Sequence, residues 1–311
     1  MSKFSITTPG YEEMKYRRCG RNGLLLPEVA LGFWHNFGGD ADADKCRKIV
    51  EYAFEHGVTY FDLANNYGPP YGSAETRFGQ IFKQSLQAHR DEIIIATKAG
   101  HDMWAGPYGE WGSRKSLMAS IDQSLKRMQL DYVDIFYSHR PDPETPLEET
   151  MQALVDIVRQ GKALYVGISK YPAEMAARAY EYLREQHVPC LVYQGRYNML
   201  QREPEQDILE QAAAQGAGFV AFSPLAQGLL TDRYLSGSIP AGSRMTHSQF
   251  LRPGILTPEL LSQLNQWNRE AADCGLTLAQ YALKWILRRP EVTSVIVGAS
   301  SVEQLKANLQ L

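Results

Sequence analysis

The feature that most constrains this sequence is a regular alternation of short apolar runs with longer segments of helical periodicity. Such alternation is typical of βα units, in which helices connect parallel strands. Eight candidate strands are present, and eight is the number that closes a (β/α)8 barrel. They cover residues 29–32, 59–62, 93–98, 133–138, 164–169, 190–193, 218–223 and 294–298. The sequence therefore predicts an α/β protein with a TIM barrel.

The predicted helices carry start and stop signals. Residues 145–148 have the spacing of a capping box with proline at the first helical position, and residues 301–304 repeat the box. Gly57 and Gly161 follow apolar helical stripes and are expected to end those helices.

A hairpin is predicted ahead of the first barrel strand. Residues 15–18 and 24–26 flank Arg21-Asn22-Gly23, and Asn-Gly is a common two-residue hairpin turn. We expect this hairpin, at about residues 14–27, to close the bottom of a barrel formed by residues 28–311. Because no linker or low-complexity segment interrupts the chain, residues 1–311 are expected to form a single domain.

Composition narrows the class of partner. A net charge of -3 and a pI near 6.2 give no overall electrostatic reason to bind nucleic acid or an anionic membrane. Cys19, Cys46, Cys190 and Cys274 lack the spacing of a metal site, so no metal is expected. The polar N-terminus has no apolar leader, and no eighteen apolar residues run together. We expect a cytoplasmic protein that binds a small molecule.

Polar residues follow the predicted strands in register. In TIM barrels the catalytic groups lie at the C-terminal ends of the strands and in the loops after them. Any strand that reaches a surface ends in polar residues, so one match carries little weight, but here the pattern repeats around the barrel. The residues are Asp62, Lys98, His139, Ser169, Gln194, Ser223 and Ser300.

Asp62, Tyr67, Lys98 and His139, in this order and spacing, resemble the tetrad of the aldo-keto reductase family. Segments 32–38, 61–68, 161–169 and 223–228 extend the likeness, which is greatest to the branch holding L-glyceraldehyde 3-phosphate reductases and voltage-gated potassium-channel β subunits. The resemblance implies NADPH-dependent reduction of small aldehydes and ketoaldehydes, such as L-glyceraldehyde 3-phosphate or methylglyoxal, to alcohols. The alternative is an NADPH-binding regulatory subunit, but His139 favours the enzyme because the channel subunits carry asparagine there.

The chemistry explains why such residues are needed. Hydride delivery to a carbonyl carbon leaves negative charge on the oxygen, which an acid must protonate. Tyr67 is the candidate acid, and we expect the Lys98 ammonium to lower its pKa from about 10. Asp62 would hold Lys98, and a His139 N–H would orient the carbonyl. The alternatives are that Asp62 and Lys98 form only a structural ion pair and that His139 only packs at the barrel mouth.

No G-x-G-x-x-G motif follows the first strand, so a Rossmann crevice is not expected. Residues 298–301 begin a predicted helix, whose free N–H groups attract a phosphate. Arg233 and Arg244 match family positions near the adenosine 2′-phosphate and favour NADP over NAD, unless they are simply solvated. By resemblance, Ser169 and Gln194 hold the carboxamide, and Tyr193 or Tyr197 stacks on the nicotinamide. The full predicted cofactor set is Trp34, Ser169, Gln194, Ser223, Pro224, Leu225, Gln227, Gly228, Arg233, Arg244, Gly298, Ser300, Gln304 and Asn308.

Substrate contacts are predicted from aromatic and basic residues near the barrel mouth, namely Trp34, His35, Tyr71, Trp104 and Arg140. Arg140 would suit a substrate phosphate, although an exposed loop arginine is the alternative, and core packing is the alternative for Trp34. Residues 104–111, with interleaved glycines, are expected to form a flexible flap. The resemblance also implies a homo-oligomer, a tetramer or octamer, and a C-terminal tail beyond Leu311 that this chain lacks.

Overall fold

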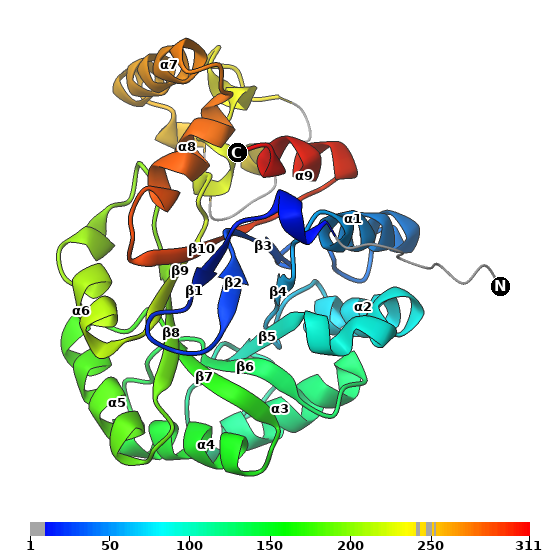
Figure 1. Ribbon diagram of the computed structural model, residues 1–311, viewed down its shortest axis with the longest axis vertical. Coiled ribbons are helices and arrows are strands. Elements are labelled where there is room, and N and C mark those ends of the chain that lie inside the picture. The colour runs from blue at the N-terminus through cyan, green and yellow to red at the C-terminus, as the bar shows by residue number, and fades with distance from the viewer. Residues whose placement is uncertain (1–9, 241–242, 247–250, 252) are drawn as a thin grey trace.

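The computed structural model describes residues 10–240, 243–246, 251 and 253–311, without the side chains of Arg244 and Pro253. Eight parallel strands close into a barrel, because β10 pairs with both β3 and β9 (Figure 1). The TIM barrel prediction is confirmed, with small shifts at strand ends. The barrel strands are β3 (Val29–Gly32), β4 (Tyr60–Asp62), β5 (Ile94–Ala99), β6 (Val133–Ser138), β7 (Ala163–Ser169), β8 (Cys190–Arg196), β9 (Gly218–Phe222) and β10 (Val292–Val297).

Helices surround this barrel, one between each strand and the next and one after β10. They are α1 (Ala43–Glu55), α2 (Ser73–Ile81), α3 (Arg114–Met128), α4 (Leu147–Arg159), α5 (Ala173–Glu185), α6 (Ile208–Gln215), α8 (Leu278–Leu287), which packs on β10, and α9 (Val302–Leu309). An additional helix, α7 (Pro258–Asp273), precedes α8 and lies at the top of Figure 1. Short helical turns are η1 (Tyr11–Glu13), η2 (Phe82–Leu86), η3 (Gln87–Glu92), η4 (Glu203–Glu205), η5 (Ala226–Gly228), η6 (Asp232–Tyr234), η7 (Arg244–Thr246) and η8 (Pro253–Ile255).

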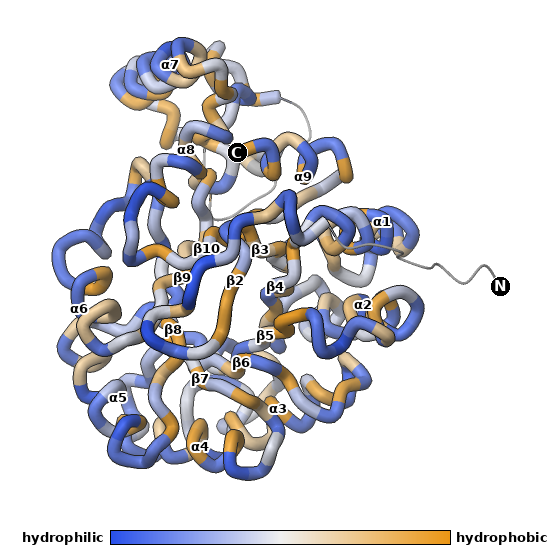
Figure 2. The backbone as a smooth tube through the Cα atoms, in the orientation of Figure 1, coloured by the Kyte–Doolittle hydropathy of each residue, from blue (hydrophilic) through white to orange (hydrophobic). Residues whose placement is uncertain are grey.

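Apolar side chains fill two layers, one inside the barrel and one between strands and helices. The helical tubes alternate between blue and orange, as expected when only one face of each helix is buried (Figure 2). Inside the barrel, the hydroxyls of Tyr60 and Tyr137 hydrogen-bond at 2.9 Å. A Cβ on Gly167 would lie 2.4 Å from the Tyr137 ring, so only glycine leaves room for it. These tyrosines form a packed floor beneath the strand ends.

The N-terminal hairpin consists of β1 (Tyr16–Arg18) and β2 (Leu25–Pro27), which lie across the barrel in Figure 1. Arg17 donates to the Val292 carbonyl at the start of β10 (3.0 Å), so the hairpin closes the barrel bottom as predicted. The predicted Asn-Gly turn is wrong. Residues 20–23 form the loop, and Gly20 is its left-handed residue (φ 59°), because the Asn22 amide reaches the Cys19 and Gly216 carbonyls.

The helix-end predictions have mixed outcomes. Gly57 (φ 78°) and Gly161 (φ 71°) are left-handed after α1 and α4, as expected. The prediction of a capping box at residues 145–148 is wrong. Pro146 has extended backbone (ψ 133°) and takes the N-cap position, where its side chain offers no hydrogen-bond acceptor. At α9, Ser301 accepts the predicted bond from the Gln304 N–H (3.2 Å), but the Gln304 side chain binds a neighbouring residue instead. Among the described helices, none has the length and apolar character needed to cross a membrane.

Candidate active site

The four tetrad residues meet at the C-terminal end of the barrel. Asp62 is the last residue of β4, Lys98 lies near the end of β5, and His139 directly follows β6. Because these strands are neighbours in the barrel, their side chains converge. Tyr67 follows β4 in a loop that its own N–H ties to the Ala64 carbonyl (3.1 Å). The structure therefore brings Tyr67 together with Asp62, Lys98 and His139, the residues that the strand-end pattern selected.

Lys98 and Asp62 form a buried ion pair. The Lys98 ammonium donates to Asp62 Oδ2 and to the Leu63 carbonyl, both at 2.6 Å, and its side chain is 0% exposed. Burial lowers the pKa of Lys98, and the Asp62 charge opposes that shift. The other Asp62 oxygen accepts from Gln194 Nε2 at 2.9 Å. Gln194, predicted to hold a carboxamide, therefore already uses its N–H to orient Asp62.

Tyr67 lies over this pair and beside His139. The Lys98 ammonium is 5.1 Å from the Tyr67 ring centroid, and the Tyr67 and His139 rings meet edge to face at 6.0 Å. The expected lowering of the Tyr67 pKa is wrong for this arrangement, since burial and the Asp62 charge raise that pKa well above its usual range. The reason is that Lys98 faces the ring and that Asp62 offsets its charge. Tyr67 is consequently a protonated phenol.

His139 is a buried, neutral imidazole. Its backbone N–H donates to the Ala99 carbonyl (2.8 Å), which fixes the residue at the end of β6. Burial, followed by the charges of Lys170 and Lys98, holds the pKa of His139 well below its ordinary value of 6.5. Its Nδ1 is buried without a hydrogen-bond partner in the described part of the chain. One ring nitrogen is thus a donor and the other an acceptor.

The neutral state of His139 makes stability depend on pH. Below pH 6.5 the unfolded chain binds a proton at this residue and the folded chain does not, so stability falls as the pH falls. The expected loss is up to about 1.4 kcal/mol per pH unit. His139→Asn should lessen the decline in unfolding free energy between about pH 6.5 and pH 5, measured by urea denaturation. His187→Asn, at an exposed histidine, is the control, and equal slopes for wild type and His139→Asn would contradict the assignment.

The predicted cofactor residues after β9 lie in a strained loop. Ser223 (φ 52°) and Gln227 (φ 60°) are non-glycine residues in the left-handed region, as is the intervening Ala226 (φ 47°). Such backbone strain concentrates where a chain must present groups to a ligand. Across the mouth, Ser169 Oγ at the end of β7 is buried without a partner among the described residues.

At the start of α9, part of the predicted anion site is already occupied. The Ser300 N–H and hydroxyl both donate to Gln304 Oε1, at 2.8 and 2.9 Å. Asn308 Nδ2 is buried and has no partner within the described chain. Arg233 in η6 is exposed, and no described carboxylate lies within ion-pair distance of it. The Arg244 side chain lies outside the described residues.

Neither tyrosine predicted to stack on a nicotinamide faces the barrel mouth. Tyr193 is buried in the outer layer, where its hydroxyl donates to the Tyr171 carbonyl (2.7 Å), and Tyr197 is fully buried against Trp285. Phe222, the last residue of β9, instead packs on the interior cluster at the mouth and is half-buried. Strand alternation could have found it, since Phe222 lies two residues after the inward-facing Val220.

The predicted substrate residues show varied environments. The ring centroids of Trp34 and His35 lie 3.8 Å apart, and both residues are half-buried at the mouth. Tyr71 is 51% exposed, and its hydroxyl donates to Asp102 Oδ2 at 2.6 Å. Trp104 lies in a loop that Met103 and Gly109 close by a 2.8 Å backbone bond. These environments do not assign a substrate to any of them, so their role stays a prediction.

Arg140 is engaged by the protein itself. It forms an ion pair with Glu110, donates to the Gly100 carbonyl (2.9 Å) and stacks on Trp111 at 3.7 Å from the ring centroid. Arg140 thereby ties the loop of residues 100–111 to the barrel. A phosphate-binding role for Arg140 would require it to give up these contacts.

Comparisons with known proteins agree with this geometry. Residues 28–311 match the family model described as Aldo/keto reductase family. The chain is 52% identical over 305 residues to the L-glyceraldehyde 3-phosphate reductase of Escherichia coli (strain K12), covering 96% of this chain and 88% of that protein. It is 35% identical over 303 residues to a probable voltage-gated potassium channel subunit beta of Arabidopsis thaliana, covering 96% and 90%. This chain therefore belongs to the aldo/keto reductase family.

Proposed function

We propose that this protein reduces small aldehydes and ketoaldehydes with NADPH, L-glyceraldehyde 3-phosphate and methylglyoxal being the substrates to test first. The observation that carries the proposal is the buried Lys98–Asp62 pair beneath a protonated Tyr67, with neutral His139 at its edge. The name of the 52% identical relative supports the phosphorylated aldehyde.

In this mechanism the reduced nicotinamide, when bound, supplies hydride to the substrate carbonyl carbon. Negative charge then develops on the carbonyl oxygen, and Tyr67 donates its phenolic proton to that oxygen. The His139 N–H donates a hydrogen bond to the same oxygen and fixes its direction. The Lys98 ammonium stabilises the phenolate that Tyr67 becomes, while Asp62 keeps Lys98 in place.

Buried polar atoms without partners support the fit of a nicotinamide cofactor. Buried polar groups are normally hydrogen-bonded, and Ser169 Oγ and Asn308 Nδ2 lack partners among the described residues. Ser169 would bind the carboxamide, and Asn308 would bind the adenine side. Arg233, exposed and without a carboxylate partner in the described ranges, would bind the 2′-phosphate that distinguishes NADPH.

Arg233→Ala tests the choice of cofactor. A charge-assisted hydrogen bond contributes about 1.5 to 3 kcal/mol, so NADPH affinity should fall about ten- to a hundredfold while NADH affinity changes little. Fluorescence titration at low and high salt is the measurement, because salt should narrow the difference. Arg269→Ala, at an exposed arginine of α7, is the control. Equal losses for both cofactors would place Arg233 elsewhere.

A substrate panel tests the activity. Wild-type protein should oxidise NADPH in the presence of methylglyoxal or L-glyceraldehyde 3-phosphate and should act more slowly with NADH. The second candidate, a regulatory subunit, is favoured by the 35% identity to a probable channel subunit, and copurification with a membrane channel would test it. Channel binding without carbonyl reduction would overturn the enzymatic proposal.

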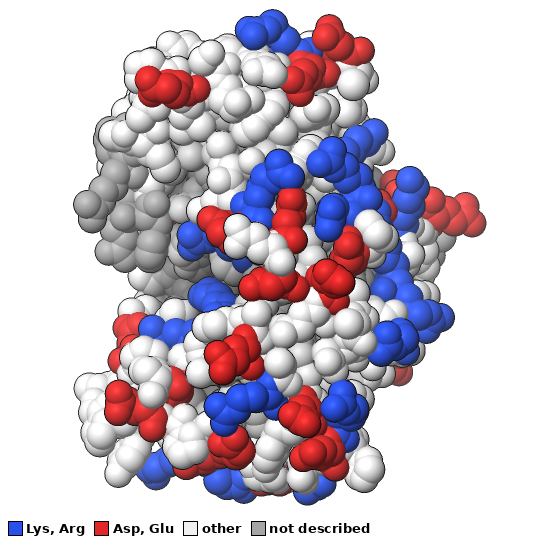
Figure 3. Space-filling view, turned by 90° about the vertical axis from the view of Figure 1, so that its left-hand side faces the viewer, with Lys and Arg blue, Asp and Glu red and all other residues white. Residues whose placement is uncertain are grey.

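We further propose a cytoplasmic location, a small-molecule substrate as the partner and a homo-oligomeric state. On the face in Figure 3, basic and acidic side chains lie interspersed, in keeping with a net charge of -3. That pattern gives no broad basic surface for nucleic acid on this face. Light scattering on the purified protein would distinguish a tetramer or octamer from a monomer.

A further inference from the structure

Two cations converge at the rim of the barrel mouth. Lys170 directly follows β7, and Arg196 is the last residue of β8. The Lys170 ammonium lies 5.6 Å and the Arg196 guanidinium 5.7 Å from the ring centroid of Phe222. The two side chains therefore share one aromatic ring that belongs to neither strand.

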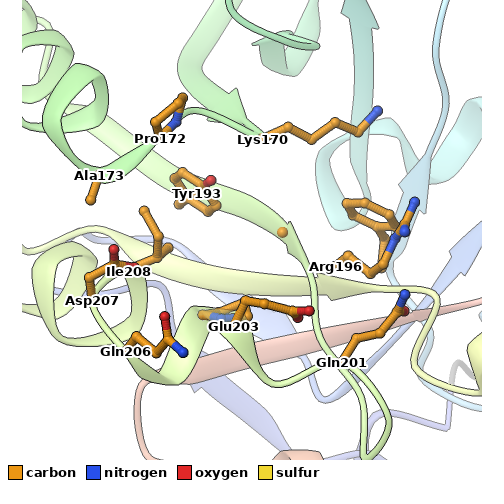
Figure 4. A pocket seen from close by; sticks show the side chains of 13 residues that line it. Lys170, Pro172, Ala173, Tyr193, Arg196, Gln201, Glu203, Gln206, Asp207 and Ile208 are labelled. Atoms are coloured by element: carbon orange, nitrogen blue, oxygen red, sulfur yellow. The ribbon is translucent and has the colours of Figure 1, made fainter.

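Within the described part of the chain, this cation pair forms no ion pair. Both side chains are exposed, and no carboxylate in the described ranges forms an ion pair with either. Glu203 and Asp207 line the same cavity, of about 450 Å³. In Figure 4 Asp207 lies at the opposite end from the two positive groups, whereas the Glu203 carboxylate lies on the side of Arg196 without forming an ion pair with it. Partial removal of the ammonium from water, followed by the charges of Lys98 and Arg196, lowers the pKa of Lys170 to about 8. Like charges held together in this way favour an anion between them.

The pair lies beside the catalytic residues. The Lys170 ammonium donates to His101 Nε2 at 3.2 Å, and the His101 ring packs edge to face on His139 at 4.5 Å. Burial and the nearby cations lower the pKa of His101 to about 4, so this ring is neutral and can accept the bond. Lys170 also has left-handed backbone (φ 62°), which is unfavourable for a residue with a side chain. The His101 ring thus lies between Lys170 and His139, the residue proposed to contact the substrate carbonyl.

We propose that Lys170 and Arg196 bind the anionic group of the substrate, a phosphate carried a few bonds from the carbonyl, and so set a preference for phosphorylated aldehydes. The inference rests on the proposed function, because it places the carbonyl at Tyr67 and His139. Arg140, the residue predicted for this role from the sequence, is already paired with Glu110. The cofactor also carries phosphates, so the test must separate the two sources.

The test compares L-glyceraldehyde with L-glyceraldehyde 3-phosphate, which differ only by the phosphate. For Lys170→Gln and Arg196→Gln, the ratio of kcat/KM for the phosphorylated over the neutral substrate should fall about ten- to a hundredfold. Lys170→Arg should keep most of the ratio. Lys115→Gln is the matched control, because Lys115 also lies over an aromatic ring, Tyr108, at 5.1 Å but outside this pair. Calorimetry with glycerol 3-phosphate measures anion binding without turnover.

An unchanged ratio in both glutamine variants would overturn the inference. A loss of NADPH affinity in these variants that matches their loss of activity would also overturn it, because Lys170 and Arg196 would then bind a phosphate of the cofactor. If wild type reduces neither aldehyde, the proposed function fails, and the calorimetry still decides the anion site. Glycerol 3-phosphate binding that both glutamine variants weaken would then support the site, and binding unchanged in both would reject it.

Discussion

Tyr67→Phe should bind NADPH with ordinary affinity and yet lose roughly two to four decades of turnover, which is the usual contribution of general acid catalysis. The substitution removes only the hydroxyl, so the ring keeps its contacts with Lys98 and His139. Steady-state kinetics with methylglyoxal, beside a fluorescence titration of NADPH, would separate the chemical step from cofactor binding.

The control for this variant is Tyr52→Phe, which removes a hydroxyl from α1 on the outside of the barrel. It should keep wild-type turnover. Near-normal turnover of Tyr67→Phe would show that another group donates the proton. In that case the mechanism proposed for the tetrad would be wrong.

Lys98→Met should abolish turnover and also destabilise the fold. The variant leaves Asp62 as a buried carboxylate without its cation, and breaking a buried pair in this way costs roughly 3–5 kcal/mol. Urea denaturation followed by circular dichroism would measure the loss in unfolding free energy. A loss below about 1 kcal/mol, the range of exposed ion pairs, would contradict the buried pair.

The double variant Asp62→Asn/Lys98→Met separates the structural role from the catalytic one. With neither charge present, most of the lost stability should return, because no uncompensated ion is buried. Activity should stay absent, since no cation stabilises the Tyr67 phenolate. A double variant that recovers both stability and turnover would mean that the pair is only structural.

The sequence by itself determined the barrel and the meeting of the tetrad. Parallel strands joined by helices all end at the same edge, so a polar residue at the end of each strand must face the same space. That rule located Asp62, Lys98 and His139 without any knowledge of distances. The likeness to a family then added Tyr67, which lies in a loop beyond the strand pattern.

Local sequence signals predicted turns and helix ends less well where a side chain could bind a distant part of the chain. Gly57 and Gly161 end their helices as expected, because a left-handed residue is required there whatever surrounds it. The Asn22 side chain, in contrast, reaches the Gly216 carbonyl across the barrel bottom, and the turn forms at Gly20 instead. A contact between distant segments decided that conformation.

Only the tertiary structure decided which side chains are already engaged and which face the mouth. Gln194 donates to Asp62, Gln304 binds Ser300, and the pKa of Tyr67 rises because its hydroxyl is buried and lies near the Asp62 charge. Barrel strands are apolar on both faces, so composition alone did not show which face is inside; the inward-facing Val220 had to be known before alternation placed Phe222 at the mouth and Tyr193 in the outer layer. Lys170 and Arg196 belong to different βα units, and their convergence over Phe222 exists only because the barrel closes and places those strand ends side by side.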